Sequence, residues 1–558
     1  MYLILILASF VSMTHQNVVT TAQGLIRGVS KEGYISYIGI PYASANGTGR
    51  FKRAGLAPSW TGIREANDPH CTAASPVDNC LQLDVNVPTN PNDQPWSVLV
   101  WVKGGSGFYH PGQLVRRGII MVTVRHRVGP LGFLCTHEEQ IPGNAGVKDV
   151  VLALRWVRDN IVAFKGNSDN VVLAGESFGA AIVETIMLSP MSQGLFHGVI
   201  MQSGTVLSPW AFNYNPKSRI KTLMMAYKNK DFPNILLETN VEDLVTKSKD
   251  LDMPYFPFGI CVERSFKKEE RLLAEPPYDL LSDGKVIGVP LIIGYNNNEA
   301  YIFAKMLKLA QVVKRISTDM MFLLPMELDD LGSRELNQTR DKIKGIYFKN
   351  GNFNLTSVIQ YHSDAYFINH IHRSAKLHSS STTYPVYYYQ FSHSGDTGVE
   401  PENGMDKVGA AHSDELAFLF SENGKTLSGD DGKVQDKLVT LWANFVKYLC
   451  LNNVYTISPI YGVVHGTSTF GQDARWNVLW FELPKLKKSE FYLISSIWIF
   501  RNPTPDISNL ARWEALDHRV PRLLNIGMEM EMMDYPRTTA MDMWDEVYEK
   551  YYTRNRAV

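Results

Sequence analysis

The chain has 558 residues, of which 45% are hydrophobic and 20% charged, and its 55 Lys and Arg nearly balance its 56 Asp and Glu to give a net charge of −1. This is the composition of a globular soluble protein, and no basic patch or block of like charges indicates a nucleic-acid partner. The length alone allows three or four domains, but the candidate site residues described below are scattered along the chain, which favours one large domain.

The chain opens on an apolar run, MYLILILASFVSM, that is too short to span a membrane and suits a secretory signal peptide. No Lys or Arg precedes the run, so only the terminal amine supplies positive charge. We expect residues 1–15 to be a signal peptide and the mature chain to be secreted to the extracellular space, with a buried first strand as the alternative. Three Asn-x-Ser/Thr triplets, at Asn46, Asn337 and Asn354, are compatible with N-glycosylation in that compartment.

The chain has five cysteines, an odd number. Cys71 and Cys80 bracket a short polar loop and could pair in an oxidising compartment. Three further cysteines lie in mixed or apolar contexts and are interpreted as buried thiols: Cys135, Cys261 and Cys450. No Cys-x-x-Cys spacing occurs, and His370 and His372, two residues apart, are typical of a helix surface. The sequence therefore predicts no metal site.

Residues 97–112, SVLVWVKGGSGFYHPG, are an alternating apolar run followed by glycines. The pattern predicts a strand that leads into a Gly-rich loop. Because glycine lets the backbone approach closely, such a loop can aim N–H groups at a carbonyl oxygen. The candidate donors are the amides of Gly105 and Ser106, and a flexible surface turn is the alternative.

Residues 170–188, NVVLAGESFGAAIVETIML, hold a serine between two glycines, after a β-branched run and before a buried helix. A strand that turns straight into a helix strains the corner residue and brings its neighbours close together, so Gly175 and Gly179 stand where small residues are needed. The Ser177 hydroxyl would then project above the sheet as a nucleophile, and the amide of Phe178 would be a third donor. The Gly-x-Ser-x-Gly pattern by itself is weak evidence for a nucleophile, and the prediction rests on the apolar run before it and the buried helix after it.

Two later segments supply an acid and a base, which acyl transfer by a serine requires. Residues 289–303 have a buried-strand core and then a polar loop with Glu299, and residues 408–420 place His412 among small residues ahead of an apolar helical stretch. Taken singly, they would be an ordinary solvated carboxylate and a structural histidine. The chain order Ser177, Glu299, His412 is the order found in α/β-hydrolases, which favours a catalytic triad.

The chain resembles the type-B carboxylesterases of the cholinesterase-like α/β-hydrolase family, and insect carboxylesterases most of all. The motifs that carry the resemblance extend over most of the chain and include GIPYA, NCLQLDV, VGPLGFL, GESFGAA, GLFHGVIMQSG, GYNNNEA, AAHSDELAFLF and NPTPDISNL. The resemblance implies the α/β-hydrolase fold, with a large, mostly parallel central sheet flanked by helices, in a single domain over residues 16–558.

The resemblance also assigns residue roles, each on a matching position. It implies a nucleophile at Ser177, an acid at Glu299 and a base at His412. It further implies oxyanion-hole amides at Gly105, Ser106 and Phe178, and a disulfide between Cys71 and Cys80. The implied activity is hydrolysis of small-molecule carboxylic esters through an acyl-enzyme, with no metal or organic cofactor. The chain ends in YYTRNRAV, so we expect no transmembrane segment.

Several positions depart from the family pattern. The oxyanion loop is usually His-Gly-Gly-Gly-Phe, but this chain has Lys103 at the histidine position and one extra residue before Phe108. Since loss of one oxyanion donor costs about 10² to 10³ in turnover, a shifted loop would make a slow enzyme. Phe178 replaces a small residue and narrows the pocket, and together with Glu176 it departs from the Gly-Gln-Ser-Ala-Gly of juvenile hormone esterases. A slow, sequestering or catalytically weak binding protein is the alternative function.

About fifty residues, at 449–501, separate two stretches that nearly adjoin in the family. This insert includes the apolar run FYLISSIWIF. We hypothesise that the insert is foreign to the fold, for example sequence from an unspliced intron, and a functional surface insertion is the alternative. Peptides from residues 451–500 in the native protein would contradict the first hypothesis.

Overall fold

The computed structural model describes residues 17–45, 49–69, 80–92, 94–105, 110–227, 234–249, 257–267, 269–301, 313–315, 324–325, 327–328, 331–351, 353–396, 409–420, 426–451, 512–536 and 539–555. The predicted signal peptide and nearly all of the predicted insert lie outside these ranges, and so do Asn46, Cys71 and Ser106.

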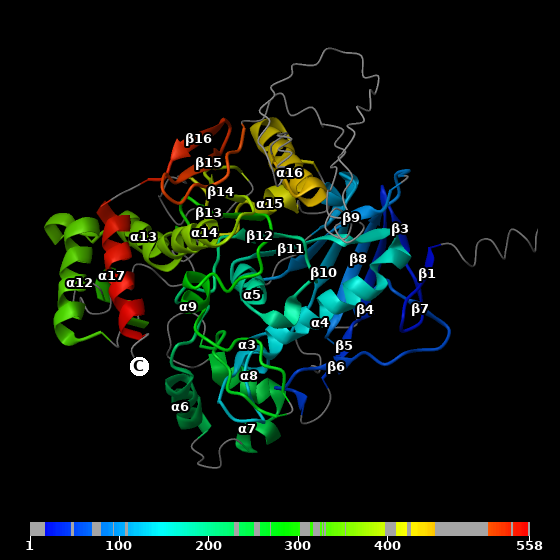
Figure 1. Ribbon diagram of the computed structural model, residues 1–558, viewed down its shortest axis with the longest axis horizontal. Coiled ribbons are helices and arrows are strands. Elements are labelled where there is room, and N and C mark those ends of the chain that lie inside the picture. The colour runs from blue at the N-terminus through cyan, green and yellow to red at the C-terminus, as the bar shows by residue number, and fades with distance from the viewer. Residues whose placement is uncertain are drawn as a thin grey trace, which may run out of the picture.

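An 11-stranded mixed sheet runs through the middle of the molecule (Figure 1). Its strands, in spatial order, are β16 (Met530–Asp534), β15 (Arg522–Ile526), β14 (Val386–Phe391), β13 (Leu291–Asn296), β12 (Gly198–Gln202), β11 (Gly166–Glu176), β9 (Trp96–Val102), β10 (Ile120–Val124), β8 (Gln82–Pro88), β4 (Tyr34–Pro41) and β3 (Val29–Lys31). From β15 to β10 every neighbouring pair is parallel, whereas the strands outside this block are antiparallel to their neighbours. The predicted strands at 97–102, 170–176 and 291–294 belong to the parallel block.

Helices cover both faces of this sheet (Figure 1). One face packs against α4 (Ala145–Asn160), α5 (Phe178–Met187) and α14 (Asn369–Ser381), and the other against α2 (Gly112–Arg116) and α16 (Gly429–Tyr448). In β9, Val98 and Val100 point into the first core, and Leu99 and Trp101 into the second. Since successive strand side chains point to opposite faces, a strand buried on both sides needs a continuous apolar run, as β9 has.

The remaining elements surround these layers. Smaller sheets contain β1 (Val18–Thr20), β2 (Leu25–Arg27) and β7 (Ile63–Glu65), and β5 (Ala43–Ser44) with β6 (Gly55–Leu56). The other helices are α3 (Gly129–Phe133), α6 (Pro216–Tyr227), α7 (Asn234–Glu238), α8 (Val241–Lys249), α9 (Pro277–Ser282), α12 (Ser333–Tyr347), α13 (Leu355–Ser363), α15 (Leu416–Leu419) and α17 (Thr539–Asn555). Short 3-10 helices lie at Ile161–Phe164, Pro190–Ser192 and Lys349–Gly351, and a π-helical turn, η8, at Asp364–Ile368.

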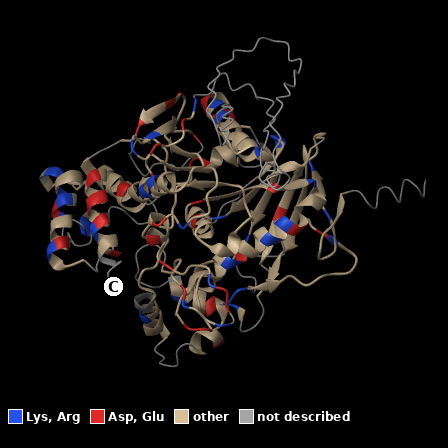
Figure 2. Cartoon of the chain, viewed as in Figure 1, with Lys and Arg blue, Asp and Glu red and all other residues tan. Residues whose placement is uncertain are grey.

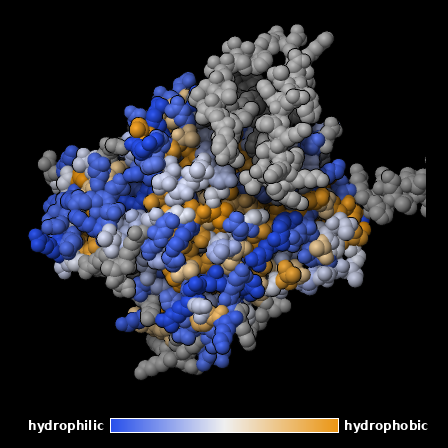
Figure 3. All heavy atoms as spheres, in the orientation of Figure 1, coloured by the Kyte–Doolittle hydropathy of each residue, from blue (hydrophilic) through white to orange (hydrophobic). Residues whose placement is uncertain are grey.

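Charge is spread over the elements, with both signs dense on α12 and α17, where Lys342 pairs with Glu546 (Figure 2). Figure 3 shows hydrophilic residues over most of one face and hydrophobic residues gathered in a band across its middle, between α16 and the α6–α8 region. Among the described residues, no helix is both long and apolar enough to cross a membrane.

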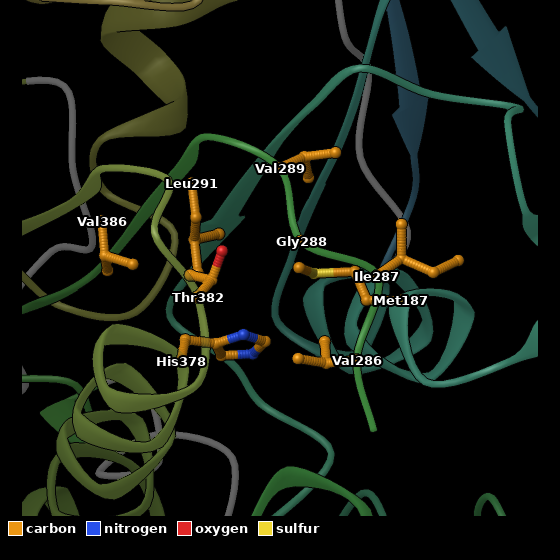
Figure 4. Close-up of a pocket in the computed structure, with 9 residues that line it drawn as sticks. All are labelled: Met187, Val286, Ile287, Gly288, Val289, Leu291, His378, Thr382 and Val386. Atoms are coloured by element: carbon orange, nitrogen blue, oxygen red, sulfur yellow. The ribbon is translucent and has the colours of Figure 1, made fainter. Parts of the chain in front are cut away.

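A shallow, mostly apolar pocket lies at the end of the sheet where β13 and β14 begin (Figure 4). Its walls include Met187 at the end of α5 and His378 of α14. His378 Nε2 lies 3.0 Å from Oε1 of the buried Glu184, and Thr205 Oγ1 and the Val206 amide donate to Oε2 at 2.5 and 2.7 Å. This polar cluster ties α5 to α14 and to the chain just after β12.

Candidate active site

Ser177 is the single residue between the end of β11 and the start of α5. Its backbone has φ 58° and ψ −126°, a region that a residue with a side chain rarely adopts and that costs about 1–3 kcal/mol. The Ser177 amide donates to the Gln202 carbonyl of the neighbouring strand at 2.8 Å, which holds the turn against β12. The predicted sharp strand-to-helix turn is therefore present.

Glycines let four backbone segments meet around this turn. A Cβ atom at Gly175 would lie 2.5 Å from the Gly179 carbonyl carbon, and one at Gly179 would lie 2.3 Å from the Val102 carbonyl oxygen. A Cβ atom at Gly204 would lie 2.1 Å from the Ser177 carbonyl oxygen. Real Cβ atoms do not approach so closely, so a side chain at any of these positions would push the segments apart.

The Gly-rich loop after β9 passes directly beside the turn. A Cβ atom at Gly104 would lie 2.2 Å from the Glu176 carbonyl oxygen and 3.1 Å from the Phe178 nitrogen. Gly105 follows with open space where its Cβ would be. The structure thus places the loop that leads into Gly105 beside the Phe178 amide, whereas the third predicted donor, Ser106, is outside the described residues.

The predicted acid and base are in direct contact. Nδ1 of His412 lies 2.7 Å from Oε2 of Glu299, and the other carboxylate oxygen accepts a hydrogen bond from the Asn296 amide at 2.8 Å. The His412 amide donates to the Glu299 carbonyl at 3.2 Å. Glu299 is fully buried and His412 is 8% exposed. Because β11 and β13 both end at the carboxyl edge of the sheet, the two residues meet beside Ser177.

Nε2 of His412 faces a carboxylate that the sequence analysis did not assign. It lies 3.3 Å from Oε1 of the buried Glu176, which also accepts a hydrogen bond from Ser413 Oγ at 2.6 Å. Within the described part of the chain, the Ser177 hydroxyl has no hydrogen-bond partner. In unliganded sites the nucleophile–base hydrogen bond is often open and closes when substrate binds.

Three buried carboxylates therefore surround one imidazole. Burial lowers the pKa of His412, but the charges of Glu176, Glu299 and Glu415 outweigh this effect and raise it to about 9. Burial raises the pKa of Glu176. The pKa of Glu415 is raised to about 8, mainly by burial and also by repulsion from the charges of Glu176 and Glu299. Glu415 keeps hydrogen bonds from Gln202 and Asn296, at 2.9 and 2.5 Å.

The cysteine interpretation was wrong for two residues. Cys135 and Cys261 form a disulfide that closes 126 residues of chain and joins the segment after α3 to the strand-like segment near Ile260. Only the fold brings their Cα atoms to 6.7 Å, because nothing in the local sequence links them. Cys450 forms no disulfide, as expected, but it is half-buried and not buried, and its Sγ lies 3.5 Å from the Tyr387 hydroxyl. Cys80 is disulfide-bonded, and since Cys71 is outside the described residues, the pair Cys71–Cys80 stays a prediction.

The interpretation of His370 and His372 as helix surface was also wrong. Both lie on α14, but they are 0% and 4% exposed. Rings from the C-terminal part of the chain cover them: Tyr548 lies 4.6 Å from His370, and Tyr535 stacks on His372 at 3.4 Å.

Two of the three predicted glycosylation sites are in the described part of the chain. Asn337 is exposed on α12, and Asn354 is exposed at the N-cap of α13, where its side chain accepts a hydrogen bond from the Ser357 amide. Both side chains face solvent, which an N-linked glycan requires.

The amino-acid sequence of this chain is similar to those of known proteins. The profile described as "Carboxylesterase family" matches residues 15–544. Esterase FE4 of Myzus persicae is 28% identical over 459 residues, which are 74% of this chain and 80% of that protein. The juvenile hormone esterase of Heliothis virescens is 26% identical over 486 residues, covering 76% of this chain and 84% of that protein.

A similar solved structure is that of juvenile hormone esterase from Manduca sexta with OTFP covalently attached. The two structures superpose with a TM-score of 0.76 at 24% identity, covering 96% of this chain and 99% of that chain. The α/β-hydrolase fold predicted from the sequence is thereby confirmed, as is the resemblance to carboxylesterases and to those of insects.

Proposed function

The chain belongs to the carboxylesterase family and is a carboxylic ester hydrolase, and from this premise we propose that Ser177, His412 and Glu299 form its catalytic triad. The observation that carries the proposal is the 2.7 Å contact between His412 Nδ1 and Glu299 Oε2 beside the strained turn at Ser177. A carboxylate on Nδ1 fixes the tautomer that leaves Nε2 free to accept a proton.

The reaction proceeds in two halves. In the first, Nε2 of His412 takes the proton of the Ser177 hydroxyl while Oγ attacks the ester carbonyl carbon, and the imidazolium then protonates the alcohol as it leaves. In the second, water attacks the acyl-enzyme and gives its proton to the same nitrogen, and the imidazolium passes it to Ser177 Oγ as the acid is released. Glu299 orients the imidazole and stabilises the imidazolium in both halves.

Backbone amides stabilise the negative charge that develops on the carbonyl oxygen. We assign this role to the amides of Gly105, Ser106 and Phe178. The close passage of Gly104 along the turn supports the assignment, because it holds the loop within reach of the Phe178 amide. Amide donors arranged before the reaction begins account for about 10² to 10³ of turnover each.

The surroundings of the triad belong to the same proposal. We propose a single domain over residues 16–558 that is secreted after removal of residues 1–15, is glycosylated at Asn46, Asn337 and Asn354, and acts on small-molecule esters. The exposure of Asn337 and Asn354 supports the glycosylation sites. A disulfide between Cys135 and Cys261 is in keeping with an oxidising compartment.

A second candidate function is a slow, sequestering esterase. The position of His412 favours it, because Nε2 faces Glu176 and the pKa of His412 is raised to about 9. A base with that pKa is protonated in most molecules at neutral pH, where it cannot activate Ser177. Such a protein would bind esters and acylate slowly.

The experiment that tests the proposal is hydrolysis of p-nitrophenyl acetate and butyrate by the secreted protein, with Ser177→Ala and Glu299→Gln as variants. We expect turnover in the parent, none in Ser177→Ala and a large loss in Glu299→Gln. Slow turnover at neutral pH, with a first turnover no faster than the steady state, would identify the sequestering form. Equal turnover in the parent and Ser177→Ala would refute the triad.

A further inference from the structure

A row of aromatic rings extends from the catalytic base past the residue that follows the nucleophile. The ring centroid of His412 lies 4.9 Å from that of Phe367, which lies 5.5 Å from Trp210. Trp210 lies 6.4 Å from Phe178, and Phe178 meets Phe133 edge-on at 4.8 Å. The row therefore borders the site from the Glu299–His412 pair to the turn.

Most of this wall is buried. Phe133, Trp210 and Phe367 are 3%, 4% and 2% exposed, and Trp210 Nε1 donates to the Tyr366 carbonyl at 2.8 Å. Phe178 differs, because it is only half-buried. As the first residue of α5, it cannot move its backbone without moving Ser177, and the edge-on contact with Phe133 holds its ring.

The chemistry of the proposed triad decides which part of an ester faces this wall. In the tetrahedral intermediate, the oxyanion points to the Phe178 amide and the alcohol oxygen to Nε2 of His412. The alcohol must depart and water must enter by the same route, so that side has to open to solvent. The acyl substituent stays bonded to Ser177 between the two steps and can lie against a closed apolar wall.

We propose, on the basis of the triad proposed above, that the Phe178 ring fills the end of the acyl-binding space and limits this enzyme to esters of short-chain carboxylic acids. On this proposal, acetyl and butyryl groups end before they reach the Phe178 ring. Longer chains meet the ring, which its edge-on contact with Phe133 holds in place. The alcohol part of the ester is not restricted by this residue.

The test is the kcat/KM of p-nitrophenyl esters of increasing acyl length, measured for the parent, Phe178→Ala and Phe178→Leu. In the parent, we expect the octanoate-to-acetate ratio of kcat/KM to be about tenfold or more below the butyrate-to-acetate ratio. In Phe178→Ala, the octanoate-to-acetate ratio should rise about tenfold or more, with a smaller rise in Phe178→Leu, which keeps more of the packing against Phe133.

Two controls separate acyl selection from general loosening. Phe353 is another half-buried phenylalanine, stacked on Phe348 outside the row, and Phe353→Ala should keep the chain-length profile of the parent. A series of acetate esters with larger alcohols should give the same ranking in the parent and in Phe178→Ala.

The possible results separate the role of Phe178 from that of the proposed triad. A change in alcohol ranking instead of acyl ranking, or a parent that hydrolyses octanoate as well as acetate, overturns the role of Phe178 while leaving the triad intact. Absence of Ser177-dependent turnover with every ester refutes the proposed function, and the inference with it.

Discussion

Replacing Glu176 with glutamine tests whether the carboxylate beside Nε2 sets the pH dependence of the enzyme. The substitution removes a charge and keeps the shape of the side chain. Oε1 of Glu176 accepts a hydrogen bond from Ser413 Oγ at 2.6 Å, and an amide oxygen can accept the same bond. The variant should therefore keep its local packing.

The expected change in the pKa of His412 follows from the distance between its Nε2 and Oε1 of Glu176. At the observed 3.3 Å, two unit charges interact by roughly 5 kcal/mol at an effective dielectric constant of about 20, which corresponds to about 3.5 pKa units. This is an upper bound, because it treats both groups as full point charges and allows no relaxation of their surroundings. We expect Glu176→Gln to lower the pKa of His412 by about 1 to 2 units.

The direction of the effect on activity follows from the role of His412 as a base. Only unprotonated His412 can take the Ser177 proton, so kcat/KM of the parent should rise with pH until about 9. In Glu176→Gln the rising limb should move to lower pH. Below that limb, kcat/KM should increase about tenfold for each unit by which the pKa falls.

The assay is kcat/KM for p-nitrophenyl acetate between about pH 6 and about pH 10, with Ser177→Ala measuring spontaneous hydrolysis. Glu415→Gln is the graded control, because Glu415 contributes less than Glu176 to the pKa of His412. The rising limb of the pH profile should move less in Glu415→Gln than in Glu176→Gln. An unchanged midpoint in Glu176→Gln would refute the view that this carboxylate holds the proton on His412.

Three further substitutions test the surrounding fold. Gly104→Ala brings a Cβ atom to 2.2 Å from the last carbonyl oxygen of β11, so the oxyanion loop must shift, and kcat should fall by about 10² to 10³. Cys135→Ser with Cys261→Ser opens a loop of 126 residues and should lower the free energy of unfolding, measured with urea, by about 2–5 kcal/mol. Burial raises the pKa of Glu184, but its hydrogen bonds lower it overall, so the ionised form stabilises the fold at neutral pH and this contribution is lost as pH falls. Glu184→Gln should therefore cost about 3–5 kcal/mol near neutral pH and less in acid, as thermal unfolding at several pH values would show.

Matched variants separate these causes from general damage. Gly105→Ala adds a Cβ atom into open space and should lose far less turnover than Gly104→Ala; equal losses would contradict the crowding argument. Cys450→Ser removes a thiol that takes part in no disulfide and should leave the free energy of unfolding nearly unchanged, because a hydroxyl can keep the contact with Tyr387. Glu242→Gln alters an exposed carboxylate and should hardly change the free energy of unfolding. A loss of stability as large as that of Glu184→Gln would contradict the explanation that burial of Glu184 causes the cost.

The sequence predicted the parts of the site that depend on local pattern. A β-branched run, a glycine-flanked serine and a buried helix specify the turn at Ser177, because only small neighbours allow that backbone geometry. A polar loop directly after a buried strand identified Glu299, and small neighbours ahead of an apolar helical stretch identified His412. The family resemblance then supplied the fold, which the comparisons confirmed.

What the sequence could not show depends on contacts between distant segments. Glu176 is adjacent to Ser177 in the chain, but its contact with Nε2 of His412 exists only because the segment before α15 folds over the end of β11. The disulfide between Cys135 and Cys261 and the burial of His370 likewise depend on segments more than a hundred residues apart. Local sequence fixes backbone conformation and which face of a strand is apolar, and so it determined the fold class and the candidate triad. Which side chains touch was decided by the packing of the whole sheet and its helices, since side-chain distances depend on every element between them.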